Sequence, residues 1–177
     1  MSLLSRARES KFERMSNGDL SVENAVIVYQ NFSGSPTKFN PVGGKRTFGL
    51  VLDEEMADIL KSEGWNIKYR EPREEGDDPL IFTEIVVNME SKYPPKVAVY
   101  SRFGNKRNVN NLDAETINQL DEIDIESIDL IIHPYEHGRS TTTTVKGYAK
   151  VIRVIQAPDA YFGGKYADWE SDAVEAY

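Results

Sequence analysis

The feature that most constrains the fold of this chain is a series of short apolar runs, rich in β-branched and aromatic residues, that glycine and proline separate. The first run is Ala25 to Phe32 (AVIVYQNF), and the segment 33–45 that follows contains three glycines and two prolines. Such runs are typical of β-strands, and such punctuation is typical of loops. Six further runs follow along the chain, at 46–52, 65–70, 80–88, 97–101, 128–132 and 144–156.

Two short helices are expected between these strands. Asp53 can cap the first, because acidic residues follow it in the first turn, and Gly64 can end it. Asp113 can cap the second. Neither helix stands where a crossover between parallel strands would need one. The sequence therefore predicts a mainly β, antiparallel, barrel-like domain with one or two short helices.

Composition along the chain suggests three parts. Residues 1–18 are polar and show only a broken helical stripe, so we expect a flexible N-terminal arm. Residues 19–158 hold all the predicted strands and form the domain. Residues 159–177 contain five acidic side chains against one lysine, which predicts an acidic C-terminal tail.

The charge pattern restricts the function more than the net charge does. The chain carries a net charge of -8, which by itself argues against a nucleic-acid binder. However, the segment 91–108 holds five basic residues and no acid, and 111–129 holds seven acids and no base. Charge segregated in this way can build a local basic surface on an acidic protein.

The sequence gives little support for a catalytic or cofactor-binding site. The chain has no cysteine, which excludes disulfides, thiolate zinc sites and cysteine nucleophiles. His133-Pro134-Tyr135-Glu136-His137 matches an inverted zinc-peptidase motif, but that motif needs a helix, and Pro134 would break it. We therefore expect no enzyme activity, no metal and no cofactor.

The segment Gly43 to Thr47 (GGKRT) is similar to the end of a phosphate-binding loop. The glycine that such a loop needs five residues before Gly44 is replaced by Phe39, and a strand rather than a helix follows. A loop with two cations is the better interpretation.

The remaining pattern is cations interleaved with aromatic residues. Single-stranded nucleic acid is bound by cations that follow its phosphates and by aromatic faces that stack on its bases. Trp65 and Phe48 are also the strongest candidates for the core. The predicted nucleic-acid-binding residues are Lys38, Phe39, Lys45, Arg46, Trp65, Lys68, Tyr69, Arg70, Arg73, Tyr100, Arg102, Phe103, Lys106 and Arg107.

Several short motifs between residues 25 and 168 belong together. The most specific is G-W-N-I-K-Y-R-E-P-R-E-E-G-D at 64–77. The others are N-F-S-G (31–34), K-F-N-P (38–41), G-K-R-T-F (44–48), V-L-D-E-E (51–55), Y-P-P-K-V (93–97), I-D-L-I-I-H-P-Y (128–135) and K-Y-A-D (165–168). With these motifs the chain resembles phage single-stranded DNA-binding proteins of the OB-fold type.

This resemblance implies an OB-fold-like barrel that coats single-stranded DNA, without strong sequence preference, in phage replication or recombination. It also suits the acidic tail, which could occupy the cationic surface until DNA displaces it, or contact replication or recombination proteins. No apolar run approaches a membrane span and no signal peptide is evident, so a cytoplasmic protein is expected, in the host cell if phage-encoded. Oligomer formation stays open.

Two alternatives remain from the sequence. The segregated charges could instead pair between protein molecules, as in a virion component or a protein that contacts host proteins. The other alternative is a small enzyme that acts on nucleic acid, which the lack of a metal-ligand or nucleophile constellation disfavours.

Overall fold

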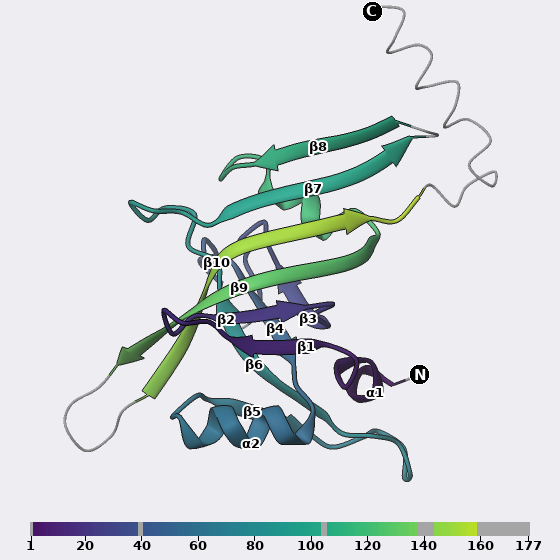
Figure 1. The fold of residues 1–177 in the computed structure, drawn as a ribbon, viewed down its shortest axis with the longest axis vertical. Helices are drawn as coiled ribbons and strands as arrows, with labels where there is room; N and C mark the ends of the chain where they lie inside the picture. The colour runs from purple at the N-terminus through teal and green to yellow at the C-terminus, as the bar shows by residue number, and fades with distance from the viewer. Residues whose placement is uncertain (1, 39–40, 104–105, 138–143, 159–177) are drawn as a thin grey trace, which may run out of the picture.

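The computed structural model describes residues 2–38, 41–103, 106–137 and 144–158, and it shows a mainly β protein (Figure 1). Two α-helices are present in this part of the chain, α1 (Leu3–Ala7) and α2 (Glu54–Ser62), together with the 3-10 helix η1 (Ile117–Asp121). The strands are β1 (Lys11–Arg14), β2 (Leu20–Glu23), β3 (Ile27–Asn31), β4 (Thr47–Val51), β5 (Ile67–Arg70), β6 (Leu80–Val86), β7 (Lys96–Phe103), β8 (Lys106–Leu112), β9 (Ile125–His137) and β10 (Thr144–Gln156).

All of these strands belong to one sheet, which is organised around β10. The main path runs β1-β2-β9-β10-β6-β4-β3, with β5 paired to β6 and with β7 joining β10 to β8. Strand β9 follows one side of β10 along its length. The other side of β10 pairs first with β6, at Gly147 and Tyr148, and then with β7, from Val151 to Ile155. Strands β6 and β7 therefore follow one another along the same side of β10.

The pairings of β10 with β6 and β7 are parallel, so the antiparallel prediction is wrong for these strands. The sequence contained no crossover helix, but β8, η1 and β9 together supply the long connection that returns the chain in the parallel direction. Within the described residues no strand pairing joins β3 to β1, and the predicted closed barrel is not observed.

The first residues of the chain form part of this fold, whereas the sequence predicted a flexible arm over 1–18. Leu4 and Ala7 are buried at helical spacing in α1, and the Ser2 side chain accepts a hydrogen bond from the Ser5 N–H at the start of the helix. Phe12 on β1 packs against the core. The sequence did not reveal these two elements because a one-turn helix and a four-residue strand are too short to show a recognisable hydrophobic periodicity.

The two predicted helices have different outcomes. The Asp53 side chain accepts a hydrogen bond from the Met56 N–H (2.8 Å) and begins α2, and Gly64 follows its end with a φ of 101°, as predicted. The predicted second helix is the 3-10 helix η1, with Ile117 and Leu120 buried. None of the described helices is long and apolar enough to cross a membrane.

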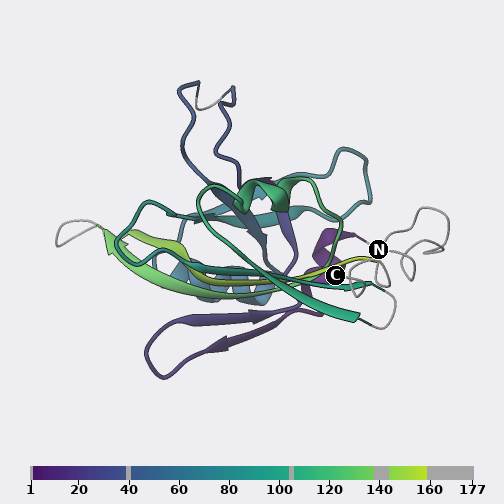
Figure 2. The same cartoon turned by 90° about the horizontal axis from the view of Figure 1, so that it is seen from above.

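Two strands run further than the sequence predicted. The segment 102–111 holds none of the strand runs recognised in the sequence, but it continues β7 to Phe103 and forms most of β8, whose polar residues show no apolar alternation. Strand β9 likewise continues through Pro134, which lies opposite Gly147 of β10. The sheet therefore extends at both ends beyond its buried centre (Figure 2).

Trp65 occupies the core beside β10 and explains why residue 147 is glycine. Trp65 and Phe48 are both buried, as predicted. A Cβ atom at Gly147 would lie 2.7 Å from Cζ3 of Trp65 and 2.8 Å from Cδ1 of Ile85, which is closer than van der Waals contact allows. The glycine thus lets Trp65 pack directly against the backbone of β10.

We predict that Gly147→Ala destabilises the protein by about 1–3 kcal/mol, because the added methyl group overpacks the core. Urea denaturation monitored by tryptophan fluorescence measures the change. Thr144→Ala, at an exposed position of the same strand, is the control and should stay close to wild type. Equal stability of Gly147→Ala and wild type would contradict this packing.

Candidate nucleic-acid interface

Strands β7, β9 and β10 each have one buried and one exposed face over much of their length, whereas β8 is exposed at every residue except Leu112. Val97 and Val99 of β7 and Ile152 and Val154 of β10 are buried in the core. Because successive side chains of a strand point to opposite faces, the residues between them lie on the other side. We call this side the outer face. It carries Lys96, Tyr100, Arg102, Arg107, Val109, Asp129, Val151, Arg153 and Ile155.

Two arginines lie directly opposite one another on the outer face. Arg102 of β7 is paired in register with Arg107 of β8, and both are exposed. Like charges at paired positions repel one another and destabilise a sheet. In the part of the chain that the structure describes, neither guanidinium has a carboxylate within ion-pair distance. This pair is therefore well placed to bind an anion.

Two further cations lie on the same face. Arg153 of β10 is opposite Ala98 of β7 in the register, and Lys96 lies two residues before Ala98 on β7. Neither cation forms an ion pair with a described carboxylate. Asp129 stands opposite Arg153 in the register, but its Oδ1 atom accepts a hydrogen bond from the Asn24 N–H (2.9 Å) instead. The outer face thus holds four cations with no ion pair of their own among the described residues.

Near the middle of β10 the outer face is hollowed. A hollow of about 480 Å³, which we call the β10 hollow, is lined by Tyr93, Pro94, Lys96, His133, Tyr148, Ala149, Lys150 and Val151. It lies where β10 changes partner, at a bulge that leaves Lys150 without a partner in β9. Tyr148 also lines a second hollow of about 370 Å³, with Lys68, Glu84 and Lys146.

A buried carboxylate holds two of these side chains. Asp19 is almost completely buried, and its Oδ1 atom is 2.8 Å from Nδ1 of His133 while its Oδ2 atom accepts a hydrogen bond from Nζ of Lys150 (2.9 Å). Burial, the largest single effect, acts to raise the pKa of Asp19. The hydrogen bonds and charges of His133 and Lys150 together outweigh it and lower that pKa below 3.8.

The motif that resembled a zinc-peptidase site lies on a strand. His133 and His137 share one face of β9, and Glu136 points to the other because of strand alternation. The described residues contain no group of three or more histidine, aspartate and glutamate side chains that could hold a metal ion.

The structure places only some of the predicted binding residues on the outer face. Tyr100, Arg102 and Arg107 lie there, whereas alternation turns Lys106 to the opposite side of the hairpin. Trp65 is buried and its indole N–H has no described partner. Phe103 belongs to β7, and Phe39 lies outside the described residues.

Arg46 is one of the predicted binding residues, but its guanidinium is engaged within the fold. Its Nε atom donates to the Phe32 carbonyl (2.9 Å), Nη2 donates to the Ala114 carbonyl (3.0 Å), and Nη1 bonds the Glu90 carboxylate (2.8 Å). Ala114 follows the end of β8, while Lys106 and Arg107 begin it, so Arg46 and the arginine pair are separated by about the length of β8.

Three other predicted cations, Lys45 before β4 and Lys68 and Arg70 on β5, form a second group beside Glu84 of β6 or Tyr29 of β3. The Glu84 carboxylate is 3.2 Å from Nζ of Lys45 and 3.9 Å from Nζ of Lys68. The guanidinium of Arg70 lies over the ring of Tyr29, 4.9 Å from its centroid. Tyr69 alternates to the other face of β5. These cations are partly neutralised by their own contacts.

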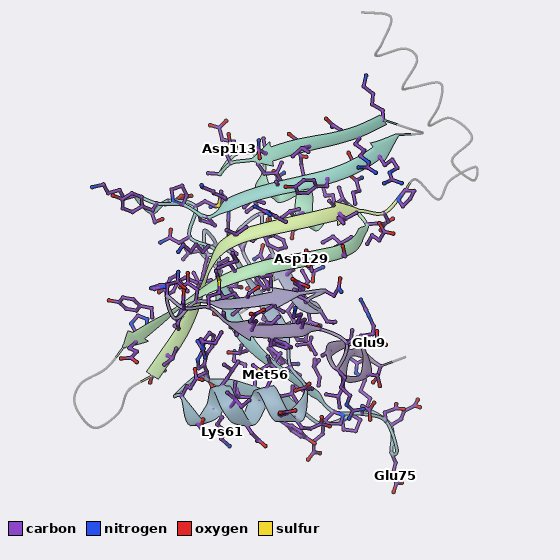
Figure 3. The ribbon with its side chains drawn as sticks, in the orientation of Figure 1. Glu9, Met56, Lys61, Glu75, Asp113 and Asp129 are labelled. Carbon is purple, nitrogen blue, oxygen red and sulfur yellow. The ribbon has the colours of Figure 1, made fainter. Side chains whose placement is uncertain are left out.

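The last predicted cations lie on loops. Arg73 is exposed in the acidic loop between β5 and β6. Glu75 of the same loop lies at the opposite end of the molecule from Asp113 and β8 (Figure 3). Lys38 is exposed in the loop between β3 and β4. The structure does not bring either of them to the arginine pair.

Sequence reasoning missed Tyr93, His133, Tyr148 and Lys150. They come from three separate segments, and only the pairing of β9 with β10 and the position of the 87–95 loop bring them together. The available signal was Tyr93 itself, a large aromatic residue before two prolines in a segment that contains no acid.

Comparison with known proteins gives a family match. Residues 9–175 match the model of the family described as "Putative phage ssDNA-binding domain". No curated protein matches the chain. Among solved structures, the single-stranded DNA-binding protein from bacteriophage Enc34 is similar at 10% identity, with 90% of this chain and 93% of that chain covered and a TM-score of 0.47. The same protein in complex with ssDNA matches at 11% identity, with 85% and 93% covered and a TM-score of 0.49.

We predict that the contribution of Asp19 to stability disappears in acid. Its pKa is lowered by folding, so the stabilisation is complete above 3.8 and is lost as the pH falls through the lower folded value. Urea denaturation of wild type and Asp19→Asn, from about pH 7 to about pH 2.5, should show a difference in free energy of unfolding that shrinks at the acid end. A difference that stays constant over this range would contradict the prediction.

Proposed function

Because this chain belongs to the phage ssDNA-binding domain family, we propose that it binds single-stranded DNA along the outer face, without strong sequence preference. The observation that supports this site is the pairing of Arg102 with Arg107, exposed and without a carboxylate partner among the described residues. Bound phosphates would relieve the repulsion between the two guanidinium groups, so the site is poised for an anionic chain.

The surroundings of this pair suit a single strand. Arg153 and Lys96 continue the cationic surface along β10 and β7. Between the cations lie half-buried or exposed apolar side chains, Tyr100, Val109 and Ile155, against which unpaired bases can pack. Among the residues that the structure describes, this surface consists of strands and carries no helix that could enter a major groove, so base stacking and phosphate contacts would dominate over base readout.

We further propose that this binding serves phage DNA replication or recombination, in which exposed single strands must be coated. The acidic segment 159–177 lies outside the described residues. We propose that it competes with DNA for the outer face, or contacts replication or recombination proteins, because its five acids complement the unpaired cations.

Titration with labelled dT, rU and duplex oligomers at two salt concentrations tests the proposed activity. We expect tight binding of single strands and weaker binding of duplex, with an affinity that falls by a log–log slope of about -0.7 per phosphate contact. Binding of duplex as tight as that of single strands, or binding unaffected by salt, would contradict the proposal.

A paired substitution tests the location of the site. Arg102→Gln/Arg107→Gln should weaken oligomer binding about tenfold at low salt and make the salt slope less steep by about 1.4, because two phosphate contacts are lost. Arg6→Gln/Lys61→Gln removes two exposed cations from α1 and α2 and is the charge-matched control. Equal effects of the two double variants would show that net charge, rather than the outer face, determines binding.

Removal of residues 168–177 (DWESDAVEAY), which hold four acids and no base, tests the proposed competition. Binding should tighten at low salt, because a tethered competitor at an effective concentration on the order of millimolar is lost. The gain should shrink as salt rises. Equal affinities of the full chain and the truncated chain at low salt would exclude this competition.

A further inference from the structure

We infer that the β10 hollow is a subsite for one nucleotide of the bound single strand, with the base against Tyr93 and Tyr148 and the adjacent phosphate on Lys96. This inference rests on the proposed function and adds to it a defined position along the DNA path.

The size and lining of the hollow fit a nucleobase. Its volume of about 480 Å³ lies within the range of small-ligand sites, roughly 300–1,000 Å³. Two tyrosines, Pro94, Ala149 and Val151 supply flat or apolar walls. Aromatic rings stack on any base, which agrees with sequence-tolerant binding.

The two tyrosines differ in how they are held. Tyr93 is 83% exposed in the 87–95 loop, with Nζ of Lys92 5.6 Å from its ring centroid, so its ring is open to a ligand. Tyr148 is partly buried on β10, and its ring meets that of Tyr135 edge-on at a centroid distance of 6.0 Å. Tyr148 is thus a fixed wall of the hollow, and Tyr93 lies at its exposed side.

The electrostatics of the hollow favour a phosphate next to the base. Its lining contains Lys96, Lys150 and His133 and no carboxylate. Asp19 lies at the edge of this group, almost completely buried, and binds both Lys150 and His133. That network fixes these two side chains and offsets the charge of Lys150. Lys96, which has no ion pair among the described residues, is left to bind the phosphate.

The register of the sheet connects this subsite to the arginine pair. Lys96 is opposite Val151 at the hollow, and along β7 the outer face then presents Ala98, Tyr100 and Arg102. At about 3.3 Å per residue, the six residues from Lys96 to Arg102 span about 20 Å. One extended strand of DNA that follows β7 would therefore contact both the hollow and the arginines.

Tyr93→Ala and Tyr148→Leu test this subsite in the full chain, with Ile59→Ala as the control. Ile59 is also an exposed apolar side chain, but it lies on the helix α2 and not on the outer face. We expect Tyr93→Ala and Tyr148→Leu each to weaken binding of a dT oligomer about 5- to 100-fold, since one stacked base is lost, and Ile59→Ala to bind like wild type. Tyr93→Ala is the decisive variant because its exposed loop position should leave the melting temperature unchanged.

A photochemical readout tests contact directly. Irradiation of wild type with a dT oligomer that carries iododeoxyuridine should yield peptide cross-links at Tyr93 or Tyr148, mapped by mass spectrometry. Cross-links confined to other residues, together with wild-type affinity of Tyr93→Ala and Tyr148→Leu, would overturn the subsite while single-strand binding itself stands. Failure of wild type to bind any single strand would overturn the proposed function and the subsite together.

Discussion

The division of β10 between two partner strands is the constraint on which the rest of this structure depends. Gly147 allows Trp65 and Ile85 to approach the backbone where β10 pairs with β6. The bulge at Lys150 then shifts the register, and the following residues pair with β7. Strand β10 pairs with β6 and with β7, so it belongs to both parts of the sheet. Its inner side packs in the core, and its outer side contributes to the β10 hollow and presents Arg153. A larger residue at 147 would disturb the packing on which this arrangement depends.

The distribution of charges in three dimensions explains how an acidic protein can present a cationic surface. Several carboxylates of the acidic segment 111–129 are used by backbone N–H groups: Asp121 accepts from Phe32 and Ser33, and Asp129 accepts from Asn24. Asp113 accepts the N–H groups of Glu115 and Thr116. These acids therefore stabilise loops and turns, and the cations of β7 and β8 stay unpaired among the described residues. The net charge of -8 says little about the outer face.

Part of the candidate site could be predicted from the sequence. Tyr100, Arg102 and Arg107 stand in a basic run without acids, and the structure places the three on one face, while their role in binding stays a prediction. Arg46 shows why the rest could not be predicted. In the sequence it is one of two adjacent cations in a glycine-rich loop, but in the fold its guanidinium bonds three distant groups, the Phe32 and Ala114 carbonyls and the Glu90 carboxylate. A residue's sequence neighbours do not reveal whether such partners exist.

The sequence by itself determined the local structure: the strand-forming runs, the start of α2 at Asp53 and its end at Gly64, the burial of Trp65 and Phe48, and the resemblance that the family match confirms. These features depend on residues close together in the chain or on hydrophobicity alone. Only the tertiary structure decided the parallel pairing of β10, the place of α1 and β1 in the fold, and the meeting of Tyr93, Tyr148 and Lys96 at one hollow. Strand pairing and shared surfaces depend on contacts between segments that are distant in the sequence. Which of these contacts form depends on how the whole core packs, and short stretches of sequence do not contain that information.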